Sequence, residues 1–117
     1  MAFPTGSGSE RIKYSTISGQ SATAGTLITG VALHIYTIVS IIVSEQINAS
    51  DTFDLYLTDS DGTSNVHRIV ISQPINGYET FVFNDRFAFD GNKMLRTITS
   101  SGANLDMTCT YIDQDWT

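Results

Sequence analysis

Two aspartates followed by a glycine are the residues whose spacing comes closest to a metal ligand set. Asp59, Asp61 and Gly62 stand as Asp-x-Asp-Gly, the order that opens a calcium-binding loop. A loop of the EF-hand type also needs a glutamate at its twelfth position, which Val70 occupies here. Asp and Gly are equally typical of tight turns. We therefore interpret the segment as a hairpin turn, and we predict no metal site and no cofactor.

The sequence shows no organised set of residues for nucleophilic or acid–base catalysis. The two histidines, His34 and His67, have no spacing to a serine and a carboxylate that would select a catalytic triad. Cys109 has no basic neighbour to activate its thiol, so a small buried core residue is the better interpretation. His67 stands beside Arg68, which favours a solvated or interface side chain. Nothing selects a carboxylate pair for glycoside hydrolysis, and we expect no catalytic residue and no enzyme.

Aromatic residues could form a platform for sugar rings, because an aromatic face packs well on them. These residues are Tyr14, Tyr36, Tyr56, Tyr78, Tyr111 and Trp116. They fall on different predicted strands, where ordinary cross-strand packing explains them more simply. A carbohydrate-binding module for host attachment is kept as an alternative function.

Alternating apolar and polar residues predict the strands that must position these side chains. Leu55 and Leu57 follow Phe53 at every second position, and the residues from Leu105 to Tyr111 alternate in the same way. Strands are predicted over residues 11–18, 26–29, 33–44, 51–58, 66–72, 78–83, 86–89, 93–100 and 103–112. Turns are expected at 59–62, 74–77 and 101–102. The pattern predicts an all-β fold, a single-domain antiparallel β-sandwich, jelly-roll-like, of about eight strands.

An apolar run between Leu33 and Val43 has two interpretations within such a sandwich. It is about eleven residues long and rich in β-branched residues, whereas a membrane helix needs roughly twenty apolar residues. We expect one or two strands here, buried on both faces or lying at a subunit interface, and no membrane partner.

The first nine residues are predicted to form a flexible N-terminal arm, with the sandwich domain over residues 10–117. Gly and Ser dominate the arm, and Pro4 discourages a helix. Phe3 gives the arm an apolar anchor, so Phe3 and Pro4 are the expected partner-binding residues. The start of the chain does not have the pattern of a signal peptide. One cysteine and no disulfide framework fit synthesis in a reducing cytoplasm.

The composition favours contacts with other proteins over contacts with nucleic acid. Only 15% of the 117 residues are charged, the formal net charge is −6, and the six basic residues are scattered along the chain. No basic patch is therefore expected, and we predict no direct nucleic-acid partner. Strands with few charges and many hydroxyls suit subunit contacts, which leads us to expect a homo-oligomer.

Several segments between residues 33 and 113 resemble small bacteriophage virion proteins. The resemblance rests on four segments: Val39–Ser44, Thr52–Leu57, Pro74–Phe83 and Leu95–Thr108. In that group a Ser/Ile/Val-rich strand precedes a strand like Thr-Phe-Asp-Leu-Tyr-Leu. A Pro-Ile-Asn-Gly-Tyr-Glu-Thr loop and a Leu-Arg-Thr-Ile-Thr-Ser-Ser-Gly hairpin come later. The resemblance covers about two thirds of the chain, and its motifs are structural.

The resemblance implies a non-enzymatic virion structural protein. Such proteins are β-sandwich modules of capsids or tails, and several are cement, or decoration, proteins that sit as trimers on the capsid exterior. The expectation is a capsid cement protein, a homotrimer that bridges and stabilises subunits of the major capsid protein. It would be assembled in the host cytoplasm and located on the capsid exterior. A tail, collar or fibre-connecting component is the alternative within the same class.

Overall fold

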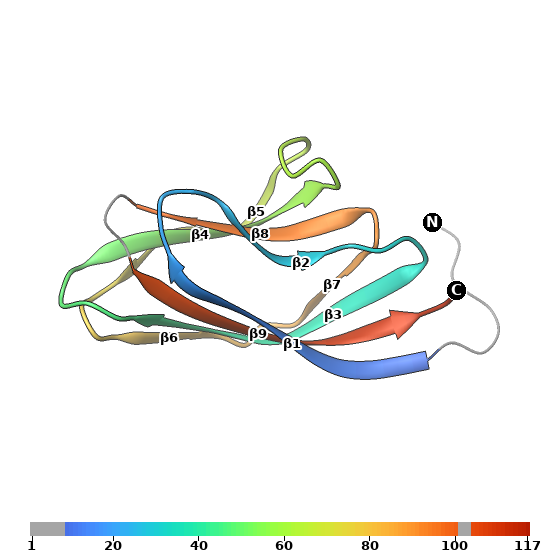
Figure 1. Ribbon diagram of the computed structural model, residues 1–117, viewed down its shortest axis with the longest axis horizontal. Helices are drawn as coiled ribbons and strands as arrows, with labels where there is room; N and C mark the ends of the chain where they lie inside the picture. Colours follow the sequence, from blue (N-terminus) through green and yellow to red (C-terminus); the bar gives the residue numbers. More distant parts are fainter. Residues whose placement is uncertain (1–8, 101–103) are drawn as a thin grey trace.

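Two antiparallel β-sheets face each other in the computed structural model, which describes residues 9–100 and 104–117 (Figure 1). Its principal extents are 50 × 27 × 20 Å. The described residues form nine strands and no helix. The strands are β1 (Ser9–Gln20), β2 (Gly25–Thr29), β3 (His34–Glu45), β4 (Asp51–Asp59), β5 (His67–Ile75), β6 (Thr80–Phe83), β7 (Phe87–Asp90), β8 (Lys93–Thr99) and β9 (Leu105–Asp115).

The strand order is that of a jelly roll. One sheet runs β1-β9-β3-β6, with β7 also paired to β3, and the other runs β2-β8-β4-β5. β6 and β7 both pair with β3, at Ile41–Ser44 and at Ile35–Ile38 respectively, so they act as one interrupted strand. Counting them as one gives the eight strands of a jelly roll. The predicted all-β, jelly-roll-like sandwich of about eight strands is confirmed.

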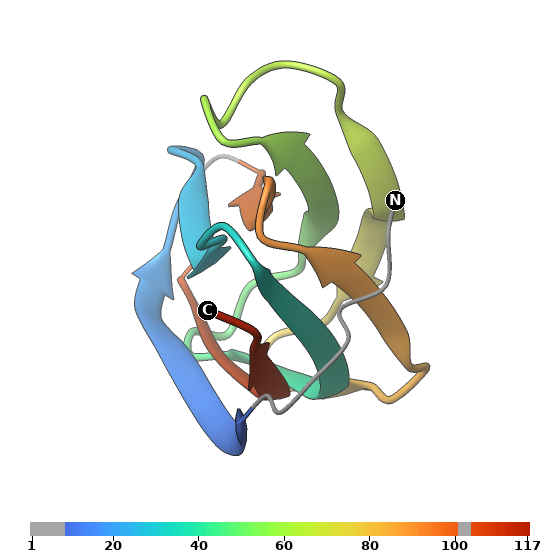
Figure 2. The ribbon, with the colours of Figure 1, turned by 90° about the vertical axis from the view of Figure 1, so that its right-hand side faces the viewer.

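The topology is that of one long hairpin rolled up on itself. The chain reverses between β4 and β5, which pair with each other. Moving outward from this reversal, β3 pairs with β6 and β7, β2 with β8, and β1 with β9. Rolling then brings β9 against β3 and β8 against β4, which completes both sheets. The first and last strands therefore lie side by side, and β1 forms an edge of its sheet (Figure 2).

The core fills the space between the two sheets, where side chains from every second residue meet. Its buried hydrophobic members are Leu27, Ile28, Tyr36, Ile38, Ile41, Val43, Phe53, Leu55, Ile75, Phe89, Leu95, Leu105, Met107 and Cys109. The alternation predicted for β9 is confirmed, because Leu105, Met107 and Cys109 are at most 1% exposed. The interpretation of Cys109 as a buried core residue is confirmed too.

The central apolar strand β3 is buried on one face within the chain. Ile41 and Val43 are fully buried, whereas Ile42 between them is 41% exposed. A register shift after Ile38 inserts an extra residue, a β-bulge that moves the alternation on by one position. Burial of β3 on both faces is therefore wrong for the chain taken alone, and the interface interpretation stays open.

Strand β5 extends further than the sequence predicted. Pro74 was expected in a loop but lies inside β5, opposite Thr52 of β4. Proline is tolerated there because β5 is an edge strand, so the missing N–H removes no bond to a further strand. Two register shifts beside Leu55 place extra residues in β5, whereas β4 pairs with β8 without a shift. Tyr56 and Thr58, which alternate with Phe53, Leu55 and Leu57 along β4, are buried as well.

Some predictions concern parts of the chain outside the described residues. These include the partner-binding residues Phe3 and Pro4, and the last turn at Ser101 and Gly102. β1 begins at Ser9, the last residue that was assigned to the arm. Within the described residues, no helix is long and apolar enough to cross a membrane.

Candidate functional site

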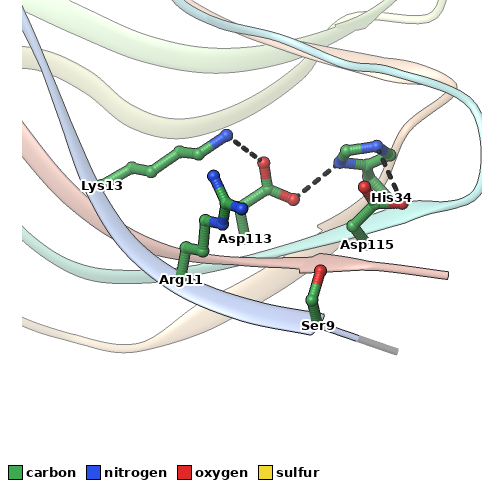
Figure 3. A pocket seen from close by; sticks show the side chains of 6 residues that line it. All are labelled: Ser9, Arg11, Lys13, His34, Asp113 and Asp115. Atoms are coloured by element: carbon green, nitrogen blue, oxygen red, sulfur yellow. Dashed lines mark hydrogen bonds and ion pairs between the residues drawn. The ribbon is translucent and has the colours of Figure 1, made fainter. Parts of the chain in front are cut away.

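A small polar pocket lies where β1 and β3 begin and β9 ends (Figure 3). The volume of the pocket is about 130 Å³. Its lining residues are Ser9, Arg11, Lys13, His34, Asp113 and Asp115. The strand register explains this grouping. Ser9 and His34 both lie opposite Asp115, and Arg11 lies opposite Asp113, so these side chains share the inner face of the sheet.

Asp113 is the centre of the pocket and is only 5% exposed. Lys13 donates from Nζ to Asp113 Oδ2 at 2.8 Å, and His34 Nδ1 lies 2.7 Å from Asp113 Oδ1. Burial alone would raise the pKa of Asp113, but the hydrogen bonds from Lys13 and His34 outweigh it and hold the pKa below its ordinary value. The carboxylate therefore stays ionised, and it ties β9 to both of its neighbouring strands.

His34 is held between two carboxylates, which limits what it can do chemically. While Nδ1 contacts Asp113, Nε2 lies 3.4 Å from Asp115 Oδ1. A catalytic histidine of a triad needs one ring nitrogen free to take a proton from a nucleophile. The described residues contain no hydrogen bond between His34 and a hydroxyl or a thiol. With the Lys13–Asp113 ion pair, these contacts form a structural polar network that lacks the geometry of a catalytic triad.

An aromatic stack continues from the pocket into the core. The rings of His34 and Tyr36 have centroids 5.9 Å apart, and Tyr36 stacks in turn on Phe89 at 5.4 Å. The Tyr36 hydroxyl accepts a hydrogen bond from the backbone N–H of Val31 at 3.0 Å. Burial raises the pKa of this phenol, which therefore stays neutral. The stack anchors the loop between β2 and β3, which places His34 over Asp113.

A second polar pair lies at the other end of β3. Glu45 is 3% exposed, and its Oε1 accepts a hydrogen bond from the N–H of Ile47 at 3.2 Å. Glu45 Oε2 and Asp51 Oδ2 are both buried, and neither accepts a hydrogen bond from a described donor. Burial, together with the neighbouring Asp51 carboxyl, raises the pKa of Glu45. The two groups satisfy each other when Glu45 carries a proton that Asp51 accepts.

This pair predicts a stability that depends on pH in a particular direction. The pKa of Glu45 is raised on folding. The protonated side chain therefore contributes to the free energy of unfolding below pH 4.5, its ordinary pKa, and this contribution is lost as the pH rises through the folded pKa. Glu45→Gln keeps a hydrogen-bond donor and cannot ionise. The free energy of unfolding of the variant should therefore increase relative to that of the wild type as the pH rises above 4.5. Urea unfolding of both proteins between pH 4 and pH 8 measures this difference. A constant difference over that range would contradict the shared proton.

The predicted turn at Asp59 and Asp61 uses its carboxylates on the turn itself. Asp61 Oδ1 accepts hydrogen bonds from the N–H groups of Thr63 and Ser64 at 2.9 and 2.8 Å. Asp59 Oδ2 accepts one from the Asn65 amide at 2.6 Å, and its other oxygen pairs with Lys93. A hydrogen bond from the Ser64 hydroxyl, together with those from the N–H groups of Ser64 and Thr63, lowers the pKa of Asp61 to about 2. The loop from 60 to 66 is longer than the hairpin turn that was expected.

We expect that calcium does not stabilise the protein through this turn. The acidic oxygens are already occupied by turn donors, so a cation would have to displace them. The melting temperature should therefore stay within about 1 °C when millimolar calcium or a chelator is added, because only a ligand that binds the native state raises it. Asp59→Ala and Asp61→Ala are the matched variants. A calcium-dependent rise of several degrees that disappears in either variant would instead establish a metal site.

The remaining predicted residues are spread over the molecule. His67 is exposed at the start of β5, in the sheet opposite to that of His34. Burial raises the pKa of the Cys109 thiol to about 12, which leaves it unreactive. Of the tyrosines, Tyr36 and Tyr56 are buried, whereas Tyr14 and Tyr78 are 74% and 71% exposed, on β1 and in the loop before β6. Among the described residues, no three His, Cys, Asp or Glu side chains gather as metal ligands.

The Lys13–Asp113–His34 cluster was missed by the sequence reasoning. Lys13 and Asp113 are 100 positions apart, so no local spacing links them. The available signal was that β1 and β9 each carry charged residues at alternate positions, on the face that should be apolar in a fully packed strand.

No protein-family model and no curated protein sequence matches the chain. Solved structures do resemble it in fold. A subunit of the Bacillus endospore appendages, described as disulfide-linked pili, superposes with a TM-score of 0.60 at 12% identity, over 100% of this chain and 97% of that one. The fold is a jelly-roll β-sandwich.

Two viral particles contain chains of similar fold. The VP2 subviral particle of infectious bursal disease virus gives a TM-score of 0.55 at 14% identity, over 92% of this chain and 33% of that chain. This chain thus spans about one third of the length of that chain. The VLP of the extra small virus of the giant freshwater prawn Macrobrachium rosenbergii gives a TM-score of 0.51 at 8% identity, over 98% of this chain and 84% of that chain. At these identities the likeness concerns the fold.

Proposed function

We propose that this chain is a non-enzymatic structural subunit of a bacteriophage virion, a cement protein that bridges and stabilises major capsid subunits. The observation that carries the proposal is the distribution of its side chains. The buried Asp113 carboxylate is engaged by Lys13 and His34 of the same chain. Large hydrophobic side chains remain exposed. They are Ile12, Tyr14, Val31, Leu33, Ile42, Val66, Ile71, Tyr78 and Val82. A rigid sandwich with exposed apolar residues and few charges suits protein contacts.

The fold comparisons and the sequence resemblance support the same class of function. The similar chains named above come from two viral particles and from a pilus. The finer role, on a bacteriophage capsid exterior and as a homo-oligomer such as the expected trimer, rests on the resemblance of the segments between residues 33 and 113. The acidic net charge of −6 suits a position away from packaged DNA.

Copy number in purified particles tests this proposal. Quantitative mass spectrometry of virions, calibrated with a labelled peptide of this chain, should find hundreds of copies per particle. Cryo-electron microscopy should place them on the capsid exterior against the coat protein. A handful of copies at one vertex would favour the tail, collar or fibre component instead. Absence of the chain from mature particles would disprove the structural role.

The proposed N-terminal arm leads to a second expected result. Deleting residues 1–8 leaves every described strand intact, so the melting temperature should change by less than about 2 °C. If the arm binds a coat-protein neighbour through Phe3 and Pro4, the truncated chain should occupy particles about tenfold less at equal concentration. Phe3→Ala in the full-length chain is the matched single-residue variant, and it should lose part of the same particle occupancy. Unchanged occupancy of both variants would count against an arm that binds the capsid.

A further inference from the structure

The outer face of the β1-β9-β3-β6 sheet carries apolar side chains that the described residues leave uncovered. Ile12 and Tyr14 on β1 are 79% and 74% exposed, and Ile42 and Val82 on β3 and β6 are 41% and 53% exposed. They point outward because their neighbours along each strand point inward, as Lys13 does toward Asp113 and as Ile41 and Val43 do into the core. Monomeric proteins rarely expose a continuous apolar surface of this kind.

The strand register joins these side chains into one surface. In the order β1, β9, β3 and then β6 or β7, the register aligns Ile12-Ile112-Thr37-Ala88, Tyr14-Thr110-Ser40 and Thr16-Thr108-Ile42-Val82. A groove of about 340 Å³ lies over the first two of these rows. Its lining residues are Ile12, Thr37, Val39, Arg86, Thr110 and Ile112. The groove is therefore lined by aliphatic and threonine side chains, with Arg86 as its charged residue, and Tyr14 and Ser40 complete the middle row.

Acidic residues on this face lie at its two ends. Glu10 and Asp90 belong to the row at one end, where Gln114 hydrogen-bonds to Glu10 at 2.7 Å. Asp106 lies at the other end, opposite Ser44. An apolar centre inside a polar rim is the anatomy of a protein–protein interface. It also lets two copies of an acidic chain meet centre to centre without opposing their negative charges, while the rim of each copy offers carboxylates to the partner's Arg86.

The size of the face matches what one stable contact requires. β1 and β3 have twelve residues each, which corresponds to a length of roughly 40 Å. Four strands at about 4.8 Å spacing give a width of roughly 19 Å. The product, about 760 Å², is close to the ~800 Å² that each partner buries in a standard interface. A single copy of similar area therefore covers the whole face.

We propose that this outer face packs against the same face of a second copy of the chain, across a twofold axis. Two sheet faces of equal size and matching pleat can pack about 10 Å apart, as the two sheets of one sandwich do. A twofold axis makes the contact self-complementary, so one surface serves both subunits. The inference rests on and deepens the proposed structural role, and it replaces the expected trimer with a twofold pair. It assigns this face to contacts between copies and leaves the other exposed hydrophobic residues for the coat protein.

Sedimentation equilibrium of the full chain tests the proposal, with one lysine variant on each sheet. The wild type should be dimeric at about 10 µM. Ile12→Lys places two lysines in the apolar contact and should raise the dimer dissociation constant at least ~30-fold, as expected for a buried interface residue. Ile71→Lys is the matched control. Ile71 is 65% exposed on β5 of the opposite sheet, so the dimer dissociation constant of this variant should lie within about threefold of the wild-type value.

Cross-linking provides a second measurement that does not depend on a destabilising charge. Thr110→Cys places a thiol in the middle row, and a bifunctional maleimide with a reach of about 10 Å should link two chains through it. Ile71→Cys should not cross-link, and native Cys109 is fully buried. A monomeric wild type at about 100 µM, a dimer that Ile12→Lys does not weaken, or an oligomer that links through Ile71→Cys alone would each overturn the proposal. Copy number in particles tests the cement role separately. A chain that pairs through this face but is absent from virions would disprove only that role.

Discussion

Replacing Asp113 with alanine should destabilise the protein by about 3 kcal/mol, which corresponds to a fall in melting temperature of roughly 10 °C. The carboxylate is 5% exposed and contacts both Lys13 and His34, so its loss leaves two donors at the mouth of a buried site without their acceptor. Lys13→Ala should cost at most about 1 kcal/mol, because that side chain is 43% exposed and solvent screens the ion pair. Chemical denaturation of both variants at pH 7 measures the contrast.

The pH dependence of the same variant gives an independent check. The folded pKa of Asp113 lies below its ordinary value of 3.8. Its contribution is therefore present above pH 3.8 and is lost as the pH falls through the folded pKa. The advantage of the wild type over Asp113→Ala should shrink as the pH falls below about 4. An advantage that stays constant down to pH 2 would show that the lost packing, and not the ionised carboxylate, accounts for the destabilisation.

Gly91→Ala is expected to cost about 3 kcal/mol, at the upper end of the range for overpacking. A Cβ on Gly91 would lie 1.7 Å from the carbonyl oxygen of Val31 and 2.4 Å from its carbonyl carbon, so backbone would have to move. The same carbonyl accepts a hydrogen bond from the N–H of His34 at 3.1 Å, and the N–H of Gly91 donates to the carbonyl of His34 at 2.9 Å. The substitution should therefore separate the β2–β3 loop from the β7–β8 turn.

Asn92→Ala is the matched control for this turn. Asn92 is exposed and contributes its backbone N–H to Asp90, which an alanine retains. It should change the free energy of unfolding by no more than about 0.5 kcal/mol. Thermal melts of both variants give the comparison, and amide exchange at Val31 and His34 should rise in Gly91→Ala alone. Equal stability of the two variants would mean that the loop adapts to an added methyl group.

The strands themselves could be predicted from the sequence because each carries its own local pattern. Leu105, Met107 and Cys109 alternate without interruption, and all three are buried in β9. Positions where the pairing shifts could not be predicted, because a bulge depends on the partner strand. The shift after Ile38 changes which residues of β3 face outward. Pro74 was placed in a loop, because edge and central strands look alike in a single sequence.

The polar pocket could not be predicted because its members come from opposite ends of the chain. Nothing near Lys13 indicates that Asp113 will lie beside it, since that proximity depends on how the hairpin rolls up. His34 was recognised only as one of two histidines, and the structure places the other in the opposite sheet. The apolar character of the Leu33–Val43 run was visible, but which of its residues face outward became clear only once the register was known.

The nested pairing of the strands bears on how the protein is made. Lys13 contacts Asp113 across 100 positions of the sequence, and among the described strands β1 pairs with β9 alone. During synthesis, which proceeds at about 5–20 residues per second, β1 would leave the ribosome several seconds before the strand that pairs with it. Topologies dominated by distant contacts also fold slowly, over milliseconds to seconds. The sheet that presents Ile12 and Tyr14 can therefore form only after β9 has left the ribosome. Assembly of copies through that sheet is then limited to chains whose translation has passed Asp115.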